Sequence, residues 1–165
     1  MMRSVLLFSL INYAMTSFSQ EVGSKTFDLM LQGLLDHSVP EVSVPEVATD
    51  QVTLLDAREK NEFEVSKLEN AQWVGYDDFS LERVASIPKN EEIVVYCSVG
   101  YRSEKIAEKL RNAGFTNVSN LYGGIFEWVN QEKPVVNPQN APTEKVHAYD
   151  RSWGRWLKKG KKVYK

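Results

Sequence analysis

Short apolar runs alternate with helical patterns along the middle of this chain, and that alternation limits the possible folds more than any other feature. The runs typical of strands are Val52–Leu55, Ala71–Val74, Ile93–Tyr96 and Val118–Tyr122. Several are rich in β-branched residues, and turns separate them from the helical patterns. Strands and helices in alternation favour an α/β fold in which helices cover both faces of a parallel sheet.

The helical patterns have recognisable ends. Residues 25–36 place their apolar side chains on one face, and residues 78–86 predict a helix that stops before Pro88. A further helix ends near Gly114, because glycine commonly follows a helix C-terminus. The pair Gly123-Gly124 opens the last helix of the pattern.

The only cysteine stands where one of these strands meets a helix. Cys97 is followed by Ser98, Val99, Gly100, Tyr101, Arg102 and Ser103. A thiolate is a strong nucleophile, and backbone N–H groups at a helix start favour negative charge. Arg102 adds a fixed cation suited to oxyanions, and Gly100 lets the backbone curl around an anion. We therefore predict that Cys97 is the nucleophile and that residues 98–103 bind its anionic forms.

The pattern Cys97-x-x-x-x-Arg102 between strand and helix resembles the active loop of single-domain rhodaneses, which are sulfurtransferases. Three further motifs resemble this family in order and spacing: Asp56-Ala57-Arg58, Glu62-Phe63, and Gly123-Gly124 with Trp128. The resemblance spans residues 38–133. A histidine that is common in the family is missing from the segment 66–71.

The resemblance implies a parallel sheet of about five strands and sulfur transfer without a cofactor. Cys97 would take sulfane sulfur from a thiosulfate- or persulfide-type donor as a persulfide and pass it to a thiol or to cyanide. Related phosphatases have a longer loop, so the six residues from Cys97 to Arg102 favour sulfur. Ser98 stands where thiosulfate-active relatives often carry a basic residue, which predicts weak thiosulfate turnover. The alternative is a non-catalytic binding or sulfur-carrier module in the cell envelope.

Two motifs support more than one interpretation. Asp56 and Arg58 either shape the active loop or form a buried ion pair as scaffold, for example Arg58 with Glu62. Gly123-Gly124 either lines the mouth of the loop or only makes a tight turn between strand and helix.

Composition limits the classes of ligand and partner that the chain is expected to bind. The formal net charge of −2 gives no sign of specific nucleic-acid binding. One cysteine permits no internal disulfide, and with two histidines it does not favour a structural zinc site.

The first 19 residues resemble a secretory signal. A short cationic start precedes a mostly apolar stretch over residues 4–18, and Ser17 and Ser19 are the small residues of a cleavage site. We predict cleavage after Ser19 and export to the periplasm or the cell exterior. The alternatives are an uncleaved anchor and a core helix. Residues 20–37 then form a helical lead-in to the domain.

The remaining residues, 134–165, are predicted as a linker and a basic aromatic tail. Residues 134–143 are rich in proline and asparagine, and residues 151–165 carry seven basic and no acidic residues. The tail either binds an acidic protein or an anionic membrane surface, or Trp153 and Trp156 pin it on the domain while its lysines stay solvated.

Overall fold

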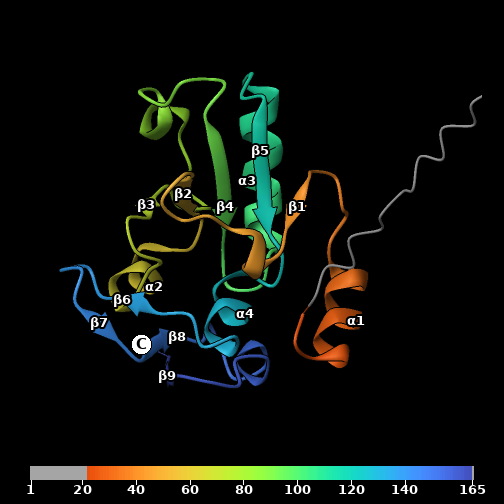
Figure 1. The fold of residues 1–165 in the computed structure, drawn as a ribbon, viewed down its shortest axis with the longest axis vertical. Helices are drawn as coiled ribbons and strands as arrows, with labels where there is room; N and C mark the ends of the chain where they lie inside the picture. Colours follow the sequence, from red (N-terminus) through yellow and green to blue (C-terminus); the bar gives the residue numbers. More distant parts are fainter. Residues whose placement is uncertain (1–21, 165) are drawn as a thin grey trace, which may run out of the picture.

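A parallel sheet of five strands lies at the centre of the molecule (Figure 1). The computed structural model describes residues 22–164, so the predicted signal segment 1–19 lies outside the described residues. In spatial order the strands are β1 (Glu41–Val42), β5 (Asn117–Leu121), β4 (Glu92–Tyr96), β2 (Thr53–Asp56) and β3 (Gln72–Trp73). All four neighbouring pairs are parallel, which confirms the predicted sheet.

Within residues 22–164, four α-helices and three short 3₁₀ helices surround this sheet. The α-helices are α1 (Lys25–Leu34), α2 (Lys60–Val65), α3 (Tyr101–Asn112) and α4 (Gly124–Asn130). The 3₁₀ helices are η1 (Val44–Glu46), η2 (Leu81–Val84) and η3 (Trp153–Arg155).

Each face of the sheet has its own hydrophobic core, because alternate residues of a strand point to opposite faces. In β4, Val94 and Tyr96 belong to a core that includes residues of α1 and α4. Ile93 and Val95 belong to a second core that includes residues of α3 and η2. The prediction of helices on both faces is therefore confirmed, and burial on both sides explains the continuous apolar run.

Strand β1 is absent from the sequence prediction. Its two residues pair with β5, with Glu41 opposite Asn120 and Val42 opposite Leu121. A strand of two residues is too short to give a periodic signal. The turn η1 follows directly, and Ser43 begins it by exchanging hydrogen bonds with Glu46.

The helix predicted over residues 78–86 is wrong in type and length, because only the 3₁₀ turn η2 forms there. Val84 is the one buried side chain of this turn. Phe79 and Ile87, on either side of the turn, also pack against the second core, so this segment buries apolar side chains without forming a longer helix. The Ser80 hydroxyl starts the turn by accepting a hydrogen bond from the Glu82 amide.

Residues 134–164 pack against the domain, in contrast to the predicted linker. Strand β6 (Val135–Val136) pairs antiparallel with β7 (Pro142–Thr143), and β8 (Lys145–His147) pairs parallel with β9 (Lys161–Val163). Both residues of β6 are buried. In Figure 1 these strands lie in the lower part of the view, to the left of α4 and next to α2.

The tail packs on the domain through its aromatic and apolar side chains, as the second of its two predicted alternatives expects. The Trp156 ring stacks on Phe27 of α1 with 5.3 Å between the ring centroids, and Leu157 is fully buried. The tail lysines at positions 158, 159, 161 and 162 remain exposed. Within residues 22–164 no helix is long and apolar enough to cross a bilayer.

Candidate active site

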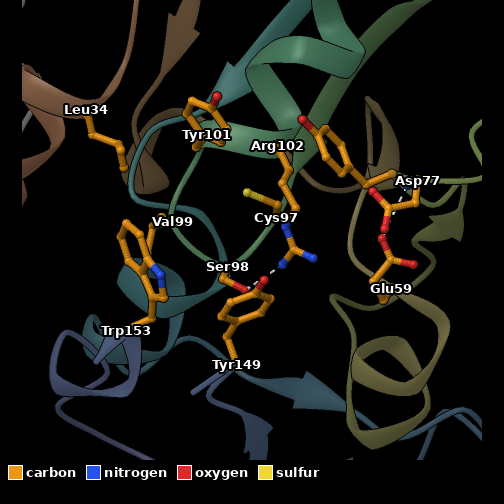
Figure 2. Close-up of a pocket in the computed structure, with 11 residues that line it drawn as sticks. Leu34, Glu59, Asp77, Cys97, Ser98, Val99, Tyr101, Arg102, Tyr149 and Trp153 are labelled. Carbon is orange, nitrogen blue, oxygen red and sulfur yellow. Dashed lines mark hydrogen bonds between the residues drawn. The ribbon is translucent and has the colours of Figure 1, made fainter. Parts of the chain in front are cut away.

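The Cys97 loop connects the end of β4 to the start of α3. Gly100 precedes the helix with a φ of 121°, a conformation that a side chain would disfavour. The Gly100 amide donates a hydrogen bond to the Cys97 sulfur over 3.1 Å. Cys97 is 1% exposed, yet it lines a pocket of about 320 Å³ (Figure 2). The sulfur therefore has a polar donor on one side and an opening on the other.

Asn120 of β5 holds this loop through hydrogen bonds of its side chain. Its side-chain amide donates to the Gly100 carbonyl over 3.1 Å. The Ser103 hydroxyl lies 3.0 Å from the same carbonyl and 2.7 Å from the Asn120 side-chain oxygen. Both side chains are fully buried, so Ser103 supports the loop and lies outside the pocket lining. The sequence analysis missed Asn120, because a lone polar residue in a strand has no distinguishing signal.

The N-terminus of α4 holds the other half of the loop. The Ile125 amide donates to the Cys97 carbonyl over 2.9 Å, and the Phe126 amide donates to the Ser98 carbonyl over 3.1 Å. Gly124 has a φ of 56°, and a β-carbon there would lie 2.4 Å from the Cys97 carbonyl oxygen. The glycine pair thus permits close packing behind the loop and takes no part in lining the pocket.

Arg102 lines the pocket, but its guanidinium group is paired with Glu62 of α2. Its two terminal nitrogens lie 2.6 and 2.8 Å from the Glu62 carboxylate oxygens, and one of them also donates to the Ser98 hydroxyl over 3.0 Å. Burial alone would raise the pKa of Glu62, but the hydrogen bonds and charge of Arg102, with Arg58 nearby, hold that pKa below its usual value. Part of the donor capacity predicted for a bound anion is therefore already used.

The predicted pair of Asp56 and Arg58 is scaffold. Arg58 donates to Asp56 over 2.9 and 2.6 Å and to the Ser66 carbonyl over 2.6 Å, and both charged residues are fully buried. They lie outside the pocket lining. The suggested partner of Arg58, Glu62, pairs with Arg102 instead. Either arginine could pair with either carboxylate, and the sequence alone does not show which pairs form.

Three residues from outside the predicted domain 38–133 complete the pocket wall. Leu34 comes from α1, and Tyr149 and Trp153 come from the tail. The Tyr149 ring centroid lies 5.1 Å from the Arg102 guanidinium carbon. Tyr76 also lines the pocket, and Glu59 and Asp77 lie on the side opposite Trp153 (Figure 2). None of these six residues was predicted from the sequence, because contacts between distant segments form the wall, and packing of the tail brings Tyr149 and Trp153 to it.

His147 lies directly behind this wall in β8. It is buried, and its Nδ1 accepts a hydrogen bond from the Tyr149 amide over 3.2 Å. Burial lowers the pKa of His147; Glu62 opposes the shift, and Arg58 and Arg102 add to it. In residues 22–164 no group of three histidine, cysteine or acidic side chains is placed to hold a metal ion.

Comparison with known proteins identifies the family. The model described as a rhodanese-like domain matches residues 45–131, more than half of the chain. The chain belongs to the rhodanese-like family. A sulfurtransferase of Allochromatium vinosum is 32% identical over 91 residues, which are 55% of this chain and 84% of that protein. This rhodanese-like chain thus resembles a protein named for sulfur transfer over most of that protein's length, which supports sulfur transfer as its general chemistry.

Other rhodanese-like relatives carry different names. A tRNA uridine(34) hydroxylase of Yersinia pestis is 32% identical over 105 residues, which are 60% of this chain and 30% of that enzyme. The chain therefore spans about a third of that relative's length. A rhodanese-related protein of Thermoplasma volcanium has a similar structure, with a TM-score of 0.53 and 25% identity over 59% of this chain and 97% of that one.

Proposed function

We propose that this rhodanese-like chain transfers sulfane sulfur through a persulfide on Cys97. The observation that carries the proposal is the position of the Cys97 sulfur, which lines the pocket and accepts the Gly100 amide hydrogen at the start of α3. That donor and the positive end of the helix dipole favour an anionic sulfur. They would stabilise a thiolate and a persulfide alike.

The chemistry has two balanced steps. The Cys97 thiolate attacks the outer sulfur of the donor, a sulfur–sulfur bond forms, and the bond to the donor breaks with its electron pair. With thiosulfate, the leaving group would be sulfite. A thiolate or cyanide then attacks the outer sulfur of the persulfide and restores the Cys97 thiolate. The attacking species is the thiolate, so the step as written transfers no proton.

In this mechanism Arg102 is a positioning residue. Its ion pair with Glu62 and its hydrogen bond to the Ser98 hydroxyl brace the loop that carries the thiol. Its positive charge still lies near the sulfur and favours the anionic states.

Mass spectrometry of the whole protein tests the proposal. Exposure to polysulfide or thiosulfate should add the mass of one sulfur atom to Cys97, and a thiol should remove it. Cys97→Ala should abolish the mass gain, and Arg102→Ala should lower the rate of transfer strongly. Full transfer activity in the Cys97→Ala protein would contradict the mechanism.

A binding or carrier role is the second candidate. Two observations favour it: the thiol is 1% exposed, and Arg102 already pairs with Glu62. A sulfur-carrier module would take up sulfur but release it only to a partner protein. A binding module would bind anions without any mass gain on Cys97. The same mass measurement, with and without a small thiol acceptor, separates these cases.

We also propose a partner for the exposed basic side chains of the tail, which are Arg151, Arg155, Lys158, Lys159, Lys161 and Lys162. Their spacing and exposure suit an acidic protein or an anionic membrane surface. Sedimentation with vesicles of anionic lipid, compared with neutral lipid, distinguishes the membrane from a protein partner. Export remains a prediction that an N-terminus at Gln20 in the mature protein would support.

A further inference from the structure

Beyond sulfur transfer itself, the walls of the Cys97 pocket point to the kind of molecule that it accepts. The family match covers residues 45–131, whereas Leu34, Tyr149 and Trp153 lie outside it. These residues are therefore an addition of this chain to the rhodanese-like core. In Figure 2, Trp153 stands across the pocket from the Glu59 and Asp77 side chains.

The side of the pocket next to the sulfur is apolar. In Figure 2 the Cys97 sulfur points away from Glu59 and Asp77, toward the side where Tyr101 and Trp153 lie. Leu34 and Val99 line this same side. A group attached to the reacting sulfur would therefore contact aromatic and aliphatic surface, and removing such a group from water favours binding.

The Glu59 and Asp77 side of the pocket disfavours an anion. Glu59 and Asp77 are acidic, and the one cationic side chain in the lining, Arg102, is paired with Glu62. The Nη2 atom of Arg102 donates hydrogen bonds to Glu62 and to the Ser98 hydroxyl. A negatively charged group on this side of the pocket would lie near these two carboxylates. The volume of about 320 Å³ suits one small molecule and no large polymer.

From these features we infer that the pocket selects an organic thiol or persulfide that carries an apolar, preferably aromatic, group without negative charge, and that Trp153 is a specificity-determining residue. As a statement about turnover, the inference rests on the proposed function. The selective step is the second one: the organic thiolate attacks the outer sulfur of the Cys97 persulfide, an organic persulfide leaves, and the Cys97 thiolate is restored.

Competition between two acceptors tests the inference. The full chain is loaded with sulfur from polysulfide, and the second-order rate of sulfur release is measured with 2-phenylethanethiol and with 2-mercaptoethanesulfonate. Each rate is divided by the uncatalysed rate of the same thiol with a small persulfide, which removes intrinsic reactivity. We expect a ratio of about tenfold or more in favour of the aromatic thiol, as burial of a few methylene-sized groups would give.

The variants make the test specific. Trp153→Ala should bring the ratio close to one, measured on protein whose sulfur loading has first been verified by its mass. Tyr164→Leu is the matched control, because this tail aromatic packs against Gly154 and does not line the pocket. A wild-type ratio near one, a ratio in favour of the sulfonate, or a ratio unchanged in Trp153→Ala would overturn the inference.

A binding measurement separates this inference from the proposed function. Benzyl methyl sulfide, which cannot accept sulfur, is titrated into Cys97→Ala protein with and without Trp153→Ala, and binding is followed by NMR. If wild-type protein gains no sulfur from any donor while Trp153-dependent binding persists, sulfur transfer fails and the pocket assignment stands. If binding is absent or independent of Trp153, the pocket assignment fails whatever the activity.

Discussion

Arg102 and Glu62 form a two-pronged ion pair beside the only thiol of the chain, with nitrogen–oxygen distances of 2.6 and 2.8 Å. The pair joins α2 to the loop that follows β4, although the two residues are 40 positions apart. It therefore links the position of the nucleophile to the packing of a neighbouring helix.

Replacing Glu62 with glutamine should destabilise the protein, because Arg102 would lose its counter-charge in a largely buried site. We expect a loss of about 2–4 kcal/mol in the free energy of unfolding, measured by urea denaturation. Asp78→Asn is the matched control, since it breaks the more exposed Arg83–Asp78 pair and should leave stability almost unchanged. Equal effects of the two substitutions would contradict the structural role of the buried pair.

Gly124→Ala should disturb the Cys97 loop. The added β-carbon would lie 2.4 Å from the Cys97 carbonyl oxygen, and the backbone at φ 56° disfavours a side chain. We expect a loss of about 1–3 kcal/mol in stability and slower persulfide formation. Gly33→Ala in α1 meets open space and should be neutral or slightly stabilising. A Gly124→Ala protein that folds and reacts like the wild type would show that the loop tolerates displacement.

His147 should make the protein less stable in mild acid. Because its pKa is lowered in the folded state, the unfolded chain binds more protons, and stability falls as the pH drops below about 6.5. His147→Asn should remove this part of the pH dependence in urea titrations.

The other histidine acts in the opposite direction. A hydrogen bond to Glu41 raises the pKa of His37, although burial opposes the shift, so its contribution is present below about pH 6.5 and is lost as the pH rises through the folded value. His37→Gln should therefore steepen the loss of stability on acidification. A profile that stays unchanged in both variants would rule out the histidines as its source.

Leu157→Ala should show that the tail is part of the folded domain. Leu157 is fully buried in the core that contains Phe27 and the α4 side chains. We expect a loss of about 2–5 kcal/mol, the usual range for a buried leucine. Lys158→Ala, one residue further along the chain and exposed, should have little effect on the melting temperature. A neutral Leu157→Ala substitution would favour a tail that does not pack.

The central sheet and the active loop follow from local sequence signals. The runs around Leu54 and Val94 are mostly apolar because both faces of their strands are buried, and the positive φ of Gly100 marks the turn into α3. These features depend on neighbouring residues only. They are therefore visible in the sequence.

The pocket wall depends on contacts that are distant in the sequence. Tyr149 and Trp153 reach the thiol only because Trp156 and Leu157 pack against the domain, and composition alone suggested a linker. The choice of partner for Glu62 is of the same kind. Asp56 is only two residues from Arg58 and takes it as a partner, which leaves Glu62 for Arg102.

The parallel pairing of β8 with β9 has a consequence for access to the thiol. Tyr149 and Trp153 belong to the connection between these strands. This part of the pocket wall is therefore a loop whose two ends are joined by the β8–β9 hydrogen bonds. Release of β9 together with Trp156 and Leu157 would loosen this connection without unpairing the central sheet, and local openings of this sort need less energy than global unfolding. We expect the rate of amide hydrogen exchange in β9 and the rate of Cys97 alkylation to change together. Opening of this distant strand would then determine how often solvent reaches the sulfur.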